Sequence, residues 1–247
     1  MPKARDAALK AISLDDKLAE AHAAYGIVLR DYDYNFTAAE MEFGRAIKLN
    51  PAYAPAYAGY ASVLADQGRF EEAFTEIGRA LKLEPLNLLF SSTYGLILIC
   101  ARRYDEAVEQ LKSTLELDAN FHSAHNFLSF VYWVKGAYAQ SVEERAKILE
   151  INADRQKADL VRESFAKGGW SEFLRVSIRE SITFGSRFYS LAAYYTALGE
   201  KDSAFAALTQ CYENREPLVS IIKVDPRLDP LHSDPRFDEF IQRVGFK

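Results

Sequence analysis

The sequence is poor in the features that mark nucleic-acid-binding and membrane proteins. It has no excess of positive charge, because 30 Lys and Arg residues stand against 35 Asp and Glu, a formal net charge of -5. Binding to nucleic acid requires a basic surface that meets the phosphates, so we expect no contact with DNA or RNA. The most apolar stretch, residues 86–101, contains Asn, Ser and Thr. It is shorter than the ~20 residues that cross a bilayer, so we expect no membrane insertion.

Signs of catalysis or of bound cofactors are also missing. The two cysteines, Cys100 and Cys211, form no Cys-x-x-Cys motif, and we interpret both as small buried residues. The sequence has no glycine-rich phosphate loop, no nucleophile elbow and no signal-peptide pattern. We therefore expect a non-enzymatic protein without a cofactor. We favour the cytoplasm over the periplasm, although two cysteines do not decide between them.

One histidine pair, His122-x-x-His125, has the spacing at which two imidazoles on one helix face can bind a metal. His125, however, occupies a repeat position that is filled elsewhere by His22, Tyr57 and Phe188. A position that accepts large aromatic residues indicates packing, so we predict no metal site.

What the sequence does contain is a repeat with a period of 34 residues. Small and aromatic residues recur in two columns: Ala39, Ala73, Ala107 and Ser141, and Phe36, Phe70, Tyr104 and Tyr138. A fixed period of this length is typical of a repeat array in which each unit packs on its neighbours.

Each unit shows the pattern of two amphipathic helices. In residues 54–87, apolar residues recur at helical spacing on both sides of Gly68. They are Tyr57, Tyr60, Ala61 and Leu64 before the glycine, and Phe70, Ala73, Phe74, Ile77 and Leu81 after it. The pattern predicts two helices joined by a tight turn.

The unit resembles a tetratricopeptide repeat. In that family, small residues lie where the two helices cross, an aromatic residue follows the turn, and a proline often closes the unit. The matching residues here are Ala61, Gly68, Phe70, Ala73, Ala80 and Pro85. Small side chains are needed because packed helix axes lie only ~8–10 Å apart. The resemblance implies an all-α, right-handed superhelical solenoid.

The repeat pattern divides the chain into five parts. We expect residues 1–16 to be the second helix of a truncated repeat, so that the chain is a fragment of a longer protein. Residues 17–153 hold four regular units, residues 154–184 a degenerate unit, and residues 185–216 a sixth unit. Residues 217–247 are a capping tail with a final helix. Three Asp-Pro steps, at Asp225, Asp229 and Asp234, are favourable helix starts, and Gly245 ends the last helix.

The tail and the first turn carry a narrower resemblance. Residues 224–237 are similar to the end of the tetratricopeptide regions of bacterial winged-helix transcription regulators, serine/threonine kinases and nucleotide cyclases. Residues 31–34 and 38–47 resemble the same group. The resemblance implies that the chain belongs to a larger bacterial signalling or transcription regulator.

The first helices of such an array line a concave groove, so the residues not used for packing are candidates for partner binding. The predicted groove residues are Leu89, Ser92, Leu96, Ile99, Asn126, Phe130 and Trp133. The groove lacks the Lys, Arg and Asn set that clamps a peptide carboxylate, so we do not expect chaperone-tail binding.

The apolar groove residues leave three interpretations open. They bind a helix or an extended peptide, or the solenoid buries them against its own later units, or two chains cover each other. We therefore predict a protein-interaction module that binds a protein or peptide partner. A self-association domain that forms a homodimer is the alternative.

Overall fold

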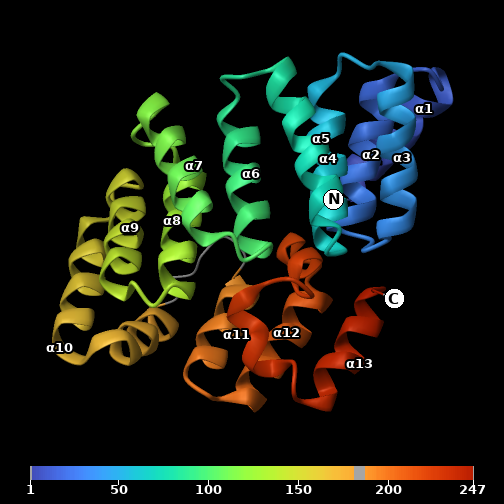
Figure 1. Cartoon of the computed structure of the whole chain (residues 1–247). Helices are drawn as coiled ribbons and strands as arrows, with labels where there is room; N and C mark the ends of the chain where they lie inside the picture. Colours follow the sequence, from blue (N-terminus) through green and yellow to red (C-terminus); the bar gives the residue numbers. More distant parts are fainter. Residues whose placement is uncertain (1, 181–186, 247) are drawn as a thin grey trace.

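The chain is a repeat array of antiparallel helix pairs. The computed structural model describes residues 2–180 and 187–246, and no strand occurs among these residues. Figure 1 shows α1 to α10 side by side in an arc, with α11 to α13 along one edge of it. The helices are α1 (Pro2–Leu14), α2 (Ala19–Asp31), α3 (Phe36–Leu49), α4 (Ala54–Asp66), α5 (Phe70–Leu83), α6 (Leu88–Cys100), α7 (Tyr104–Leu117), α8 (His122–Val134), α9 (Tyr138–Ile151), α10 (Arg155–Arg179), α11 (Arg187–Ala197), α12 (Lys201–Glu213) and α13 (Pro235–Val244), with the 3-10 helices η1 (Pro217–Ile221) and η2 (Pro226–Leu231).

The regular units are the pairs α2–α3, α4–α5, α6–α7 and α8–α9. Small residues let the paired helices approach closely, as Ala61 and Ala73 do in the second pair, where neither is exposed. Each pair buries its apolar stripe against the next pair. The predicted all-α solenoid of helix-turn-helix repeats with a C-terminal helix is confirmed.

The fifth unit is irregular, in the region where the sequence pattern loosens. α10 covers both of its expected helices and bends at Gly168 (φ -140°) and Gly169 (φ 64°). Gly169 lies in the left-handed region, where a side chain is unfavourable. The boundary that we expect at residues 184 and 185 lies outside the described residues.

The C-terminal block, residues 187–246, connects the end of the array with its beginning. Tyr34, Phe36 and Phe43 of the first unit lie in one apolar core with Tyr189 and Phe246 of the block. The rings of Phe36 and Phe246 stack at 4.3 Å between centroids. We expected the last helix to cover the end of the array. α13 does pack on α12, through the Phe240 and Tyr212 rings, and the residues after it reach back to the first unit.

Candidate functional site

The turns inside the regular units form a column that faces the C-terminal block. Gly68 (φ 80°) and Gly136 (φ 74°) adopt the left-handed conformation that closes each turn. The equivalent positions in the first and third units are occupied by Tyr34 (φ 53°) and Arg102 (φ 64°). A left-handed backbone is uncommon for residues other than glycine and marks a place to look for function.

Both of these residues contact the inserted segment, which we define as residues 216–231 with η1 and η2. The Tyr34 hydroxyl donates to the backbone oxygen of Glu216 at 3.1 Å. The Arg102 guanidinium donates to the backbone oxygen of Val224 and to the Asp229 carboxylate, both at 2.7 Å. The array therefore holds the inserted segment at its start and at its middle through side chains from two turns.

The centre of the inserted segment places an arginine in an aromatic cage. We define the cage as Phe130 and Trp133 of α8 and Tyr189 of α11. The Arg227 guanidinium carbon lies 3.8 Å from the Phe130 ring centroid, 5.4 Å from that of Trp133 and 5.8 Å from that of Tyr189. Its side chain is 3% exposed, so the cation interacts with the rings away from water, where such contacts are strongest.

A fully buried carboxylate neutralises this arginine. Arg227 Nη2 donates to Asp225 Oδ2 at 2.6 Å and Nε to Oδ1 at 3.1 Å. Burial works against the charged guanidinium, but the carboxylate more than offsets it, and the pKa of Arg227 lies above its ordinary value. Burial beside the carboxylate raises the pKa of Tyr189, so its hydroxyl stays protonated and donates to Asp225 Oδ2 at 2.9 Å.

The same three-residue unit occurs again nine residues later, as Asp234-Pro235-Arg236. In both copies the aspartate begins a helix and accepts from the backbone N–H of the arginine, at 2.8 Å for Arg227 and 3.2 Å for Arg236. Arg236 also folds back onto its aspartate and lies 4.3 Å above the Phe205 ring. Its side chain remains 45% exposed, so only the first copy is enclosed.

A second buried ion pair lies beneath η1 on the inner face, by which we mean the side of the array that the first helices α2, α4, α6 and α8 line. Arg30 of α2 donates to Asp66 of α4 at 2.6 and 3.2 Å, and the Asp66 side chain is 2% exposed. Ile221 of the inserted segment faces the same small gap, with Leu96 and Cys100. The inner face thus combines apolar contacts with paired charges.

The predicted groove residues divide into two groups along the first helices. Those in the C-terminal halves of α6 and α8 lie beneath the C-terminal block or beside it: Ile99 is not exposed, Phe130 is 2% exposed, and Leu96 and Trp133 are half-buried. At the N-terminal ends, Leu89 is 60% exposed. The other two are Ser92, which is buried, and Asn126, which is half-buried and bonded to His122. A binding role for these seven residues stays a prediction.

Sequence reasoning missed the residues that hold the inserted segment. Tyr34 and Arg102 break the glycine column of Gly68 and Gly136, and this break was the available signal. For Arg227 the signal was the repetition of Asp-Pro-Arg. Neither signal says which aromatic side chains the arginine meets, because Phe130 and Tyr189 are 59 residues apart in sequence.

The two histidines at the shared repeat position are fully bonded. His125 Nδ1 lies 2.5 Å from Glu144 Oε2, and Nε2 lies 2.9 Å from the backbone oxygen of Ala119. His22 bonds in the same way, to Glu42 and to the backbone oxygen of Asp16. A backbone oxygen only accepts, so His125 Nε2 donates to Ala119, and the Glu144 carboxylate favours a second proton on Nδ1, which gives the imidazolium form. The hydrogen bond that His125 donates to Glu144 is the main reason that the pKa of His125 is raised.

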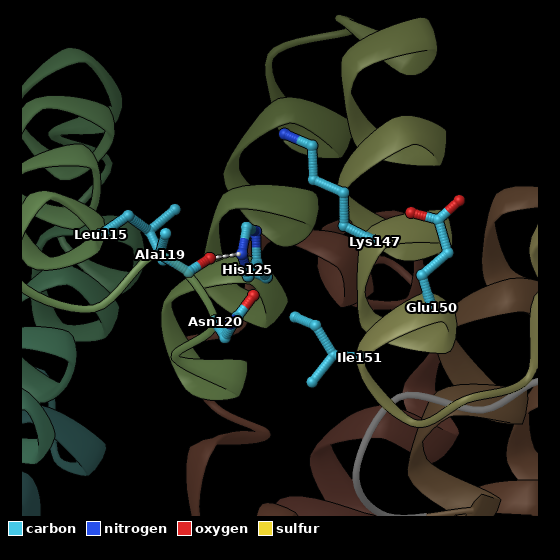
Figure 2. Close-up of a pocket in the computed structure, with 7 residues that line it drawn as sticks. All are labelled: Leu115, Ala119, Asn120, His125, Lys147, Glu150 and Ile151. Atoms are coloured by element: carbon cyan, nitrogen blue, oxygen red, sulfur yellow. Dashed lines mark hydrogen bonds between the residues drawn. The ribbon is translucent and has the colours of Figure 1, made fainter.

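Figure 2 shows the hollow of about 480 Å³ that borders His125, with the Nε2 bond to Ala119 drawn. Its lining residues are Leu115, Ala119, Asn120, His125, Lys147, Glu150 and Ile151. Because both ring nitrogens are bonded, the hollow offers no ring nitrogen as a metal ligand. Among residues 2–180 and 187–246, no cluster of three His, Cys, Asp or Glu side chains has a metal-site arrangement.

Both cysteines are buried. Cys100 and Cys211 are free thiols, and burial raises the pKa of both, so they stay protonated and unreactive. No helix in the described part of the chain has the length and apolar character to cross a membrane.

Comparison with known proteins agrees with the repeat architecture. Residues 54–85 match the model of the tetratricopeptide repeat family. No curated protein matches the chain in sequence. Among solved structures, a chain of the APC/C heterotetramer Cut9–Hcn1 is similar with a TM-score of 0.62 and 16% identity. The similarity covers 98% of this chain and 46% of that one.

PilF of Pseudomonas aeruginosa is similar with a TM-score of 0.51 and 18% identity, over 90% of this chain and 87% of that one. At these identities the likeness establishes the fold and nothing further.

Proposed function

We propose that this chain, which has the tetratricopeptide repeat fold and one repeat that matches that family, is a non-enzymatic protein-interaction module. Its inner face holds a peptide, a helix or a neighbouring domain of a partner protein. The observation that carries this proposal is that the inner face already holds a peptide-like stretch, the inserted segment. Side chains from separate units contact the backbone of this segment, which is how an array recognises an extended peptide.

Preorganisation supports the proposal. The contacting side chains stand on packed helix pairs, so binding a segment orders few groups of the array and loses little conformational entropy. The predicted groove residues contribute in two ways. Phe130 and Trp133 act as aromatic anchors, as such residues often do at interfaces, while Leu89 and Asn126 extend the surface toward the open end of the first helices.

The test uses the full chain and a fluorescent peptide with the sequence of residues 216–231. In the intact chain, the chain's own segment competes at an effective concentration on the order of millimolar. The host is therefore the Arg227→Ala variant, whose own segment has lost its central contact. We expect saturable binding by fluorescence anisotropy and weaker binding to the wild type. A peptide of the same composition in scrambled order is the control, and equal binding of both peptides would refute the proposal.

The parent protein forms part of the same proposal. The resemblance of residues 31–34, 38–47 and 224–237 to regulator regions supports a place in a larger bacterial signalling or transcription regulator, with the cytoplasm as the favoured compartment. In that setting the partner is a neighbouring domain or a second regulatory protein.

A second candidate function is self-association, and exposed apolar residues at one edge favour it. Leu83, Leu86, Leu89 and Leu117 lie around the connections that precede α6 and α8, and they are 42%, 75%, 60% and 56% exposed. A second copy of the chain would remove this surface from water. Light scattering on the wild type and on a Leu86→Glu, Leu89→Glu variant tests it. A wild-type dimer that becomes a folded monomer supports self-association, and two monomers contradict it.

A further inference from the structure

We infer that the aromatic cage of Phe130, Trp133 and Tyr189 is a recognition site for an arginine side chain, and that the partner peptide is of the Asp-Pro-Arg type. The inference rests on the proposed function and names the chemistry of the partner. In the observed state the chain's own Arg227 occupies the cage, so the inserted segment is the resident competitor of that partner.

The cage selects a guanidinium over an ammonium. A guanidinium is planar and lies flat against an aromatic ring, as Arg227 does at 3.8 Å from the Phe130 centroid. At the same time its N–H groups point sideways to both oxygens of Asp225. A lysine ammonium is a strongly hydrated point charge that cannot stack and bond to two oxygens in one plane. Replacing arginine by lysine in the bound peptide should therefore lose most of the affinity.

The aspartate and the proline of the peptide are recognised as well. The cage itself contacts the aspartate, because the Tyr189 hydroxyl of α11 donates to Asp225 Oδ2 at 2.9 Å. Asp225 also accepts from the backbone N–H of Arg227 at 2.8 Å, which begins η2. Pro226 stands between them at the first position of η2, where its fixed φ angle favours the turn. The three residues thus present the guanidinium and its counter-ion as one rigid unit.

The exposed copy shows that this unit forms without a cage. Asp234 and Arg236 make the same backbone and side-chain bonds at the start of α13, where Arg236 also pairs with Asp202 at 2.7 Å, lies over the Phe205 ring and is 45% exposed. The bonds inside the unit therefore form without the aromatic cage, which favours a low ordering cost for a peptide of this sequence. Low ordering cost is the property that lets a short segment bind a preformed site.

Two features of the contacts that hold the resident segment favour exchange. Its central contact is a buried ion pair, a type of contact whose attraction is largely offset by the loss of hydration. Tyr34 and Arg102, which hold the segment, keep an unfavourable left-handed backbone at φ 53° and 64°. Exchange also has to displace apolar side chains of the segment, because Val219, Ile222 and Leu228 are not exposed, so a competing peptide needs matching apolar residues beside its arginine.

The experiment measures three ten-residue peptides with the sequence of residues 223–232, carrying Arg, Lys or Ala at the position of Arg227. Each is titrated into the full-length Arg227→Ala variant, whose cage lacks its arginine. We expect the Arg peptide to bind at least about tenfold more tightly than the Lys peptide, and the Ala peptide to bind most weakly. The wild-type chain should bind the Arg peptide more weakly than the variant does, because Arg227 competes.

The outcomes separate the two proposals. If the three peptides bind equally, the inner face binds peptides but the arginine cage is refuted. If none of them binds, and the longer peptide of residues 216–231 does not bind either, both proposals fail. An Arg227→Lys chain is the second host in case the alanine variant does not fold, because it keeps a positive charge beside Asp225.

A small-molecule probe tests the cage directly. Methylguanidinium at low millimolar concentration should raise the melting temperature of the Arg227→Ala variant but not that of the wild type, whose cage is filled. Methylammonium at the same concentration controls for ionic strength. Equal shifts with both cations, or the same shift in the wild type, would overturn the inference.

Discussion

Arg102 donates a hydrogen bond of 2.7 Å to the backbone oxygen of Val224, 122 residues further along the chain. This bond joins the turn of the third repeat to the inserted segment. It also explains why an arginine stands in a column that holds glycine at residues 68 and 136. The left-handed turn at φ 64° aims the guanidinium at the segment and is less favourable for arginine than for glycine.

Two substitutions at residue 102 should separate the cost of the left-handed backbone from the contribution of the hydrogen bonds to the inserted segment. Arg102→Ala loses both hydrogen bonds to the segment and keeps a side chain in the left-handed region. Arg102→Gly loses the same bonds but relieves the backbone, so we expect it to be more stable than Arg102→Ala by about 1 kcal/mol. Urea denaturation measures both free energies of unfolding. Gly68→Ala is the matched control. Gly68 has φ 80°, and a Cβ there would lie 4.0 Å from Val224 Cγ1, so the substitution should lower the free energy of unfolding by a similar amount.

The two Asp-Pro-Arg units should differ sharply in their effect on stability. Arg227→Ala leaves Asp225 buried without its counter-ion, and removal of one partner of a buried pair costs about 3–5 kcal/mol. Arg236→Ala removes an exposed pair and should change stability little. Urea denaturation of the two variants, compared with the wild type, measures the difference. Equal losses would mean that burial of the first Asp-Pro-Arg unit adds nothing to the free energy of unfolding.

Stability should fall as the pH rises through the titration of His125. The pKa of His125 is raised in the folded protein, first through the hydrogen bond to Glu144, while burial of the ring and the charge of Lys147 oppose the shift. A raised folded-state pKa means that the imidazolium contributes its full stabilisation below the unfolded value of about 6.5. That contribution is lost as the pH rises through the folded pKa, when the ring gives up one of its two donated hydrogen bonds.

The measurement is a series of thermal melts from pH 6 upward on the wild type and on His125→Gln. We expect the melting temperature of the wild type to fall more steeply with pH than that of the variant. NMR titration of the four histidines gives an independent check. His125 should titrate above His122, whose pKa is lowered by burial and by Arg145. The reverse order would contradict the assignment of an imidazolium.

Enlarging a helix-crossing residue should destabilise the array. Ala73 has no exposed surface and lies in the core of the second unit with Ala61 and Ile77. Ala73→Leu adds volume where the helices touch, and such overpacking costs about 1–3 kcal/mol. Differential scanning calorimetry should show a lower melting temperature than in Thr75→Leu, an exposed position on the same helix. An unchanged melting temperature would mean that the crossing is not at Ala73.

Much of the array follows from local sequence pattern. Columns such as Phe36, Phe70 and Tyr104 recur every 34 residues because each unit packs only on its neighbours, so the same contacts are needed at each step. The start of the last helix could also be predicted from local sequence, because Asp234 and Pro235 act within the first turn of that helix. The helices at Ala54–Asp66 and Phe70–Leu83 could be predicted for this reason.

Local pattern did not decide what covers the inner face. Burial of Phe130 and Trp133 by later units was one of three interpretations that the sequence left open, and the C-terminal block covers them in the structure. The choice depends on how the units stack over the whole array, which brings Arg227 and Tyr189 over Phe130 and Trp133 of α8. Small differences in packing between neighbouring units add up over many residues. No single stretch of sequence therefore determines where the last units lie relative to the first.

The sequence by itself thus determined the repeat, its helix pairs and the capped start of the last helix, because these depend on residues within one or two units. Only the tertiary structure decided that Tyr34 and Arg102 hold the inserted segment and that Arg227 enters a cage made by α8 and α11. Those contacts join residues that lie up to 182 positions apart, as Tyr34 and Glu216 do. Contacts at such separation form only when the whole solenoid has fixed the distance between its two ends.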